Sequence, residues 1–250
     1  MILNLRQFEA LPNTPEFQFG CVVDTNILFG AAYPSDRLNT WADKFFSLCK
    51  SRKIPIYTNI NIRSEFIDLY RRVLVIESLL MIREQYKTEL SEDLEKRLKA
   101  LKQRVQENLK NNKTTQISER DIKEYRNTLL TLFPSISANG YDLWNVLCHD
   151  FLEPQLKTVW QDTETSLGIN FAGSRAIESA KFFTKAPNWD DATKIMGQSA
   201  MGSADAMIVN FFICSRFQIL ITADEQVAKY TESTLHSRRV IIVPHEDELV

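Results

Sequence analysis

The chain has 250 residues, of which 44% are hydrophobic and 25% charged, and its formal net charge is −2. This length can bury a large core without disulfides or structural metal, and the composition is that of a globular protein rather than a disordered one. No apolar stretch approaches the roughly 20 residues that cross a bilayer, and a protein that coats long stretches of duplex is usually more basic, so any nucleic-acid contact is expected to be local.

Four short apolar runs predict buried strands, the first of them Cys21–Val23. The others span residues 54–57, 218–221 and 240–243. Continuous apolar runs are typical of parallel strands that are buried on both faces. Helical patterns separate the runs, so the alternation predicts an α/β fold with a mostly parallel sheet flanked by helices.

The middle of the chain reads differently. Apolar residues recur there at spacings of four and three, which predicts one stripe on a long helix; they are Leu90, Leu94, Leu98, Leu101, Val105 and Leu109. Ser118 followed by Asp121 indicates the capped start of another helix. We therefore expect residues 1–250 to form a single domain, with halves at about 20–76 and 186–250 and a mainly helical insertion at 77–185. The stripe is expected to be an internal packing seam, with a homodimer interface as the alternative.

Four acidic residues fall where the predicted elements bring them together. Asp24 follows the first strand directly, and Asp224 lies three residues after Ile221. In a parallel sheet the carboxyl ends of the strands share one edge, which holds the binding crevice. Glu65 lies in the helical stretch 61–73 after the second strand, and Asp205 lies near the start of the helix 204–214, for which Ser203 is the expected N-cap. The four carboxylates are thus expected to converge.

Such a convergence has an electrostatic consequence. At about 4 Å, like charges repel by about 4 kcal/mol at an effective dielectric near 20. A divalent cation relieves this repulsion, and Mg²⁺ and Mn²⁺ prefer hard oxygen ligands. A metal in this position activates water and stabilises charge on a phosphodiester, so the chemistry indicated is hydrolysis of a phosphate ester.

The same segments resemble a known family. Val22-Val23-Asp24-Thr25-Asn26, Glu65, Ser203-Ala204-Asp205-Ala206 and Ile221-Thr222-Ala223-Asp224 are similar to the motifs of PIN-domain nucleases. That family includes the ribonuclease toxins of toxin–antitoxin modules and larger RNA-processing enzymes. The resemblance covers roughly residues 20–75 and 195–245.

From the resemblance we expect a PIN-like sheet in which Asp24, Glu65, Asp205 and Asp224 hold one or two Mg²⁺ or Mn²⁺ ions. Asn26, Thr222 and Ser203 would orient these carboxylates by hydrogen bonding. The substrate would be RNA, and an antitoxin-like protein is a second partner that the family implies. The 140 residues between Glu65 and Asp205 exceed the separation in the small toxins, which puts a simple toxin role in doubt.

Other interpretations stay open. Asp24 and Asp224 also suit helix caps, Asp205 suits a helix N-terminus, and Asp68 competes with Glu65 as the ligand. Asp190 and Asp191 fit either an exposed helix start or the metal rim. The basic residues Arg71, Arg72 and those within 96–104 fit either a solvated helix face or a contact with RNA backbone.

The function expected is that of a metal-dependent endoribonuclease. The alternatives are a degenerate PIN module that binds RNA or protein without cutting, and a structure-specific DNA nuclease. The four cysteines contain no CxxC pair and are expected to be reduced and buried. Together with the lack of a signal-peptide pattern at the start of the chain, this predicts a cytoplasmic protein without a membrane partner.

Overall fold

The computed structural model describes residues 1–88, 90–111, 113–131, 142–173, 180–235 and 239–249. The chain divides into two compact units. Unit 1 comprises Met1–Pro34, Leu38–Phe66 and Thr163–Val250. Unit 2 comprises Ser35–Arg37 and Ile67–Asp162.

Unit 1 is built on one six-stranded sheet in which all pairings are parallel, with the strand order β1-β6-β5-β2-β3-β4. The strands are β1 (Ile2–Leu3), β2 (Cys21–Val23), β3 (Ile56–Thr58), β4 (Ile169–Phe171), β5 (Ile219–Ile221) and β6 (Val240–Ile242). Every residue of β2, β5 and β6 is buried, as expected for strands that are covered on both faces. The predicted α/β class with a parallel sheet is therefore confirmed.

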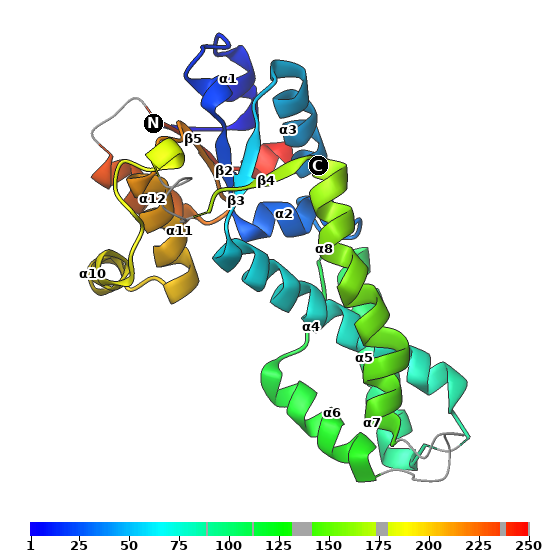
Figure 1. Ribbon diagram of the computed structural model, residues 1–250. Helices are drawn as coiled ribbons and strands as arrows, with labels where there is room; N and C mark the ends of the chain where they lie inside the picture. Colours follow the sequence, from blue (N-terminus) through cyan, green and yellow to red (C-terminus); the bar gives the residue numbers. More distant parts are fainter. Residues whose placement is uncertain (89, 112, 132–141, 174–179, 236–238, 250) are drawn as a thin grey trace. The chain divides into compact units, whose positions relative to one another are not determined.

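Helices cover both faces of this sheet, with α11 and α12 on one side of the strands and α3 on the other (Figure 1). The helices of unit 1 are α1 (Leu5–Ala10), α2 (Thr25–Ala32), α3 (Asn39–Arg52), α10 (Trp189–Ser199), α11 (Ser203–Cys214) and α12 (Glu225–Thr234). Two short 3₁₀ turns, η1 (Phe17–Phe19) and η3 (Glu246–Glu248), complete it. Helices α2 and α12 begin directly at the carboxyl ends of β2 and β5, so their N-termini lie at the edge where the carboxylates were expected.

Unit 2 is helical in its described part. It contains α5 (Glu92–Lys110), α6 (Glu119–Thr131), α7 (Leu143–Val146) and the π-helix η2 (Leu147–Leu152). Two helices continue from one unit into the other: α4 (Ile60–Gln85) and α8 (Glu153–Leu167). In the hydrophobic core of unit 2, Leu94, Leu98 and Leu101 of the predicted stripe pack with residues of α4, α6 and α7.

The structure extends several of the sequence expectations. Helix α4 runs twelve residues beyond the predicted end at 73. Strand β4 lies within the stretch 77–185 and pairs with β3, and the longer segment of unit 2 spans Ile67–Asp162. The stripe is not buried over its whole length, because Leu109 is 44% exposed.

One cap prediction is wrong. The N-cap of α11 is Gly202, with no side-chain cap, and Ser203 is the first helical residue. Ser118 does accept a hydrogen bond from the backbone N–H of Asp121 at 3.1 Å, as its spacing predicted.

The four cysteines carry free thiols. Cys21, Cys49 and Cys214 are buried, whereas Cys148 is only half-buried, contrary to the expectation that all four are buried. Among the described residues, no helix combines the length and the apolar character that a membrane crossing requires.

Candidate metal and catalytic site

The site begins where two neighbouring strands end. Strand β2 pairs with β5 in the register Val23 to Ile221, and the backbone N–H of Asp24 donates to the carbonyl of Ile221 at 2.9 Å. Asp24 and Asp224 therefore follow adjacent strands on the same carboxyl edge. Asp24 is 1% exposed, whereas Asp224 is half-buried.

A threonine joins these two aspartates. The hydroxyl of Thr222 donates to Oδ2 of Asp24 at 2.6 Å and accepts from the backbone N–H of Asp224 at 3.0 Å. The other carboxylate oxygen of Asp24 accepts from the backbone N–H of Thr25 at 2.6 Å. Thr222 is fully buried, so this geometry is fixed by packing as well as by hydrogen bonds.

Glu65 reaches the same edge from α4, which starts two residues after β3 ends. Its Oε2 accepts a hydrogen bond from the hydroxyl of Thr25 at 2.8 Å. Thr25 is the first residue of α2 and is fully buried, and it ties Glu65 to the segment that carries Asp24. Thr25 was not among the predicted site residues, although a threonine directly after a strand-end aspartate was the available signal.

Asp205 lies in the first turn of α11 and is half-buried. Burial is the main cause that raises the pKa of its carboxyl, and the negative charges of Asp224 and Glu65 raise it further. The backbone of Gly202 partly opposes this by hydrogen bonding. The pKa of Asp205 is thus raised by the charges of two of the other acids.

Among the four acids, Asp24 has the pKa that is raised most. Burial, opposed by the hydrogen bond from Thr222, raises its pKa to about 7, and the charges of Glu65 and Asp205 add to the rise. The charged groups that act on Asp24 are therefore themselves acidic. Across the two aspartates these interactions link all four predicted carboxylates into one electrostatic neighbourhood, which we call the acidic cluster.

The acidic cluster is not a closed metal cage. Within the described part of the chain, no group of three or more His, Cys, Asp and Glu side chains has the arrangement that would hold a metal ion. Mg²⁺ keeps several waters, however, and proteins bind it through one or two carboxylates rather than dedicated cages. The donor set, made of carboxylates whose charges repel one another, fits such a hydrated divalent cation in its chemistry.

Two of the acids also have a structural role. Asp24 is the N-cap of α2, and Asp224 caps α12 by accepting from the backbone N–H groups of Gln226 and Val227 at 2.7 and 3.0 Å. The helix-cap interpretation and the metal-site interpretation are therefore compatible. The positive ends of α2 and α12 also offset part of the repulsion within the acidic cluster.

Other candidates of the sequence analysis lie elsewhere or are engaged. Asn26 and Ser203 are exposed, and no hydrogen bond between described residues links either side chain to the acidic cluster. Asp68 is paired with Arg71 and Arg72, whose hydrogen bonds and charges outweigh burial and hold its pKa below the usual value. Asp191 pairs with Lys185 and accepts a hydrogen bond from the side-chain amide of Asn188, which is the N-cap of α10, while Asp190 is exposed.

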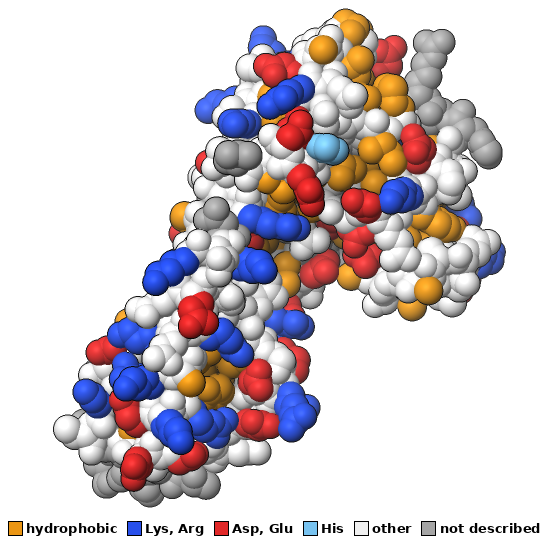
Figure 2. Space-filling model, turned by 180° about the vertical axis from the view of Figure 1, so that it is seen from behind, with side chains coloured by type: hydrophobic (Ala, Val, Ile, Leu, Met, Phe, Trp, Pro, Cys, Tyr) orange, Lys and Arg blue, Asp and Glu red, His pale blue; other side chains and the backbone are white. Residues whose placement is uncertain are grey.

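Some of the basic residues of unit 2 are ion-paired. Arg71 also contacts Glu119, and pairs join Arg97 to Glu124 and Lys102 to Glu84. On the face drawn in Figure 2, Lys and Arg alternate with Asp and Glu over this unit. The ion pairs neutralise these particular cations locally.

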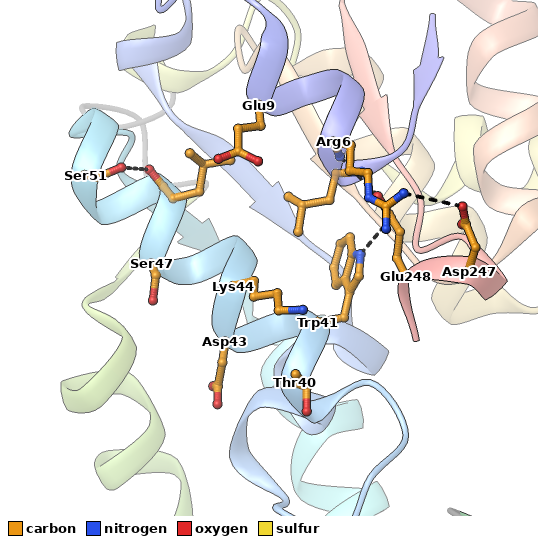
Figure 3. A pocket seen from close by; sticks show the side chains of 12 residues that line it. Arg6, Glu9, Thr40, Trp41, Asp43, Lys44, Ser47, Ser51, Asp247 and Glu248 are labelled. Atoms are coloured by element: carbon orange, nitrogen blue, oxygen red, sulfur yellow. Dashed lines mark hydrogen bonds and ion pairs between the residues drawn. The ribbon is translucent and has the colours of Figure 1, made fainter. Parts of the chain in front are cut away.

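A separate cavity of about 850 Å³ opens in unit 1 between α1, α3 and η3 (Figure 3). Charged side chains of both signs line it, including Arg6, Glu9, Lys44 and Asp247. None of the four acids of the acidic cluster lies on its wall. The cavity and the acidic cluster are therefore distinct features of this unit.

Compared with protein-family models, with curated proteins and with solved structures, the chain has no significant match in any of the three. The interpretation of the acidic cluster therefore rests on the residues and their geometry.

Proposed function

We propose that this protein is a metal-dependent endoribonuclease of the PIN type, with Asp24, Glu65, Asp205 and Asp224 as its catalytic carboxylates. The observation that carries the proposal is the hydrogen bonding that brings acids from separate segments to one edge of the sheet: Thr222 links Asp24 to Asp224, and Thr25 holds Glu65 beside them. The pKa of Asp24 is raised to about 7 by burial first, and the charges of Glu65 and Asp205 add to the rise. A fold maintains uncompensated like charges where function requires them, and perturbed carboxyl groups cluster at functional sites.

The sheet supports the PIN-like interpretation. Asp24 and Asp224 follow the adjacent parallel strands β2 and β5. Glu65 lies on helix α4, and Asp205 lies on helix α11. Four separate segments thus contribute one acid each, in the order of the motifs that resemble the family. A parallel α/β sheet binds its ligands at this carboxyl edge.

The protein residues have separable tasks. The carboxylates of the acidic cluster would hold one or two Mg²⁺ or Mn²⁺ ions and their waters. When bound, the metal would supply an activated water and neutralise charge on the phosphodiester. Thr222 fixes Asp24 relative to Asp224, and Thr25 fixes Glu65, so both threonines hold carboxylates in place by donating hydrogen bonds.

The first test is a cleavage assay on the full chain. Purified protein is incubated with single-stranded RNA or DNA in Mg²⁺, in Mn²⁺ or in EDTA, alongside Glu65→Gln. We expect RNA to be cut only with metal, and the variant to be inactive while still folded. Cutting of DNA alone would replace RNA by DNA as the substrate. Absence of cutting together with absence of metal binding by calorimetry would refute the proposal and favour a module that binds without cutting.

A second prediction concerns Thr222. Thr222→Val keeps the shape of the side chain but removes the donor to Asp24 and the acceptor for Asp224, so we expect cleavage to fall by about 10- to 100-fold. Thr222→Ser keeps the hydroxyl and is expected to retain most activity. The measurement is kcat/KM for both variants, with thermal unfolding as the control for folding. Equal activity of the valine variant and the wild type would remove Thr222 from the site.

A further inference from the structure

Apolar and aromatic side chains are exposed on the same edge of the sheet as the acidic cluster, at the carboxyl ends of β3 and β4. Phe171, the last residue of β4, is 36% exposed, and Ile60, the first residue of α4, is 67% exposed. Phe171 is the register partner of Thr58, and Ile60 follows Thr58 by two residues. Both side chains therefore belong to the rim from which Glu65 also arises.

An arginine completes this group. The guanidinium carbon of Arg63 lies 5.8 Å from the centroid of the Phe171 ring, within the range of a cation–π contact. Arg63 and Glu65 are two positions apart on α4, which places them about 200° apart around the helix. One flank of α4 thus carries Glu65 toward Thr25 of α2, and the opposite flank carries Arg63 toward β4.

We propose that Phe171, Arg63 and Ile60 form a stacking platform for one base of a single-stranded RNA substrate. Single-stranded nucleic acid is bound by aromatic faces on which bases stack, combined with cations that contact the phosphates. The platform offers an aromatic ring, an apolar neighbour and a cation held against that ring. This inference rests on the proposed function, because the same strand would cross the acidic cluster.

The distance between the platform and Asp24 suits a bound single-stranded RNA. Two steps across the sheet separate the end of β2, which carries Asp24, from the end of β4, which carries Phe171. Neighbouring strands are about 4.8 Å apart, so the platform lies on the order of 10 Å from Asp24. A base next to the cleaved phosphodiester, or once removed from it, would reach this position. Stacking accepts every base, so the platform would contribute affinity and positioning rather than strict sequence choice.

The test measures binding without cleavage. Fluorescence anisotropy follows a labelled single-stranded RNA of mixed sequence on the full chain in EDTA at low salt. Phe171→Ala is expected to weaken binding by about 10-fold or more, since loss of one stacked base has effects of this size. Phe171→Tyr keeps an aromatic face and is expected to bind like the wild type. Arg63→Gln is expected to weaken binding and to reduce the salt dependence by about one phosphate contact.

Trp189→Ala is the matched control, because Trp189 is an aromatic residue of α10 with 58% exposure. It is expected to leave RNA binding unchanged. The platform is overturned if the wild type does not bind RNA, if Phe171→Ala binds as tightly as the wild type, or if Trp189→Ala loses as much affinity. Phe171-dependent binding without metal-dependent cutting would instead overturn the nuclease proposal and leave the platform standing.

Discussion

Asp24→Asn is expected to stabilise the metal-free protein at alkaline pH while abolishing its cleavage of RNA. The folded protein raises the pKa of Asp24 to about 7, from an ordinary value of 3.8, chiefly by burial and then by the charges of Glu65 and Asp205. The Asp24 carboxyl therefore binds its proton more tightly in the folded state than in the unfolded state. Ionising Asp24 opposes folding progressively as the pH rises from about 4 to about 7, and fully above that.

Asparagine carries no charge, can keep the hydrogen bond from Thr25 and can form one of reversed direction with Thr222. Its side-chain oxygen can accept from the backbone N–H of Thr25, and its amide can donate to the hydroxyl of Thr222, which has a free lone pair. We expect the variant to exceed the wild type by about 2–4 kcal/mol in unfolding free energy above pH 7, and by little near pH 4.

The measurement is urea unfolding in EDTA at several pH values, together with the cleavage assay. The control is Asp43→Asn, because Asp43 is an exposed aspartate of α3 outside the acidic cluster. A loss of stability in Asp24→Asn at every pH would mean that Asp24 serves the fold as a cap. Retained cleavage would remove it from the catalytic group.

Glu248→Ala is expected to destabilise unit 1 by about 2–4 kcal/mol, because it leaves several buried hydrogen-bond donors without an acceptor. The carboxylate of Glu248 is 9% exposed and accepts from the backbone N–H groups of Leu5 and Arg6 at 3.2 and 3.1 Å, which start α1. It also accepts from the indole N–H of Trp41 at 3.1 Å (Figure 3). One side chain thus joins η3, α1 and α3.

The pH dependence follows from the direction of the shift. Burial alone would raise the pKa of Glu248, but hydrogen bonds from Arg6, Trp41, Leu5 and His245 outweigh it and lower the pKa. Its stabilising effect is therefore present above the ordinary glutamate pKa and is lost as the pH falls through the lower, folded value. The difference in unfolding free energy between the wild type and Glu248→Gln is expected to become smaller in that acidic range.

Glu246→Ala provides the comparison, since Glu246 is an exposed residue of the same turn. Urea unfolding at neutral pH is expected to separate the two alanine variants clearly. Equal stability of the two would show that the hydrogen bonds of Glu248 contribute nothing net to the fold.

Local patterns were sufficient for the centre of the sheet. Strands β2, β5 and β6 are continuous apolar runs, because helices cover both of their faces. Strand β4 has one buried residue and two exposed ones, and β1 has only two residues, so neither carries a recognisable pattern. Both are edge strands that depend on pairing with a neighbour already in place.

The convergence of the acidic residues could be predicted to a similar extent, while their role as a site stays a prediction. The four acids follow from their places after strands and at helix starts, and the carboxyl-edge argument needs only the strand order. The contact between Thr25 and Glu65 joins segments 40 positions apart, so local spacing could not reveal it. The N-cap of α11 was assigned one residue too late because glycine and serine are both acceptable caps at adjacent positions.

The order of the strands determines when, during synthesis, the acidic cluster can assemble. Asp24 and Thr222 are 198 positions apart, and β2 pairs with β5, whereas nearly all of unit 2 is one continuous stretch, Ile67–Asp162. During synthesis the helical unit can fold from local contacts, while the central strand pair must wait until β5 has been made. The carboxylates therefore meet only after Asp224 has been added, and a chain that stops before β5 lacks the assembled acidic cluster.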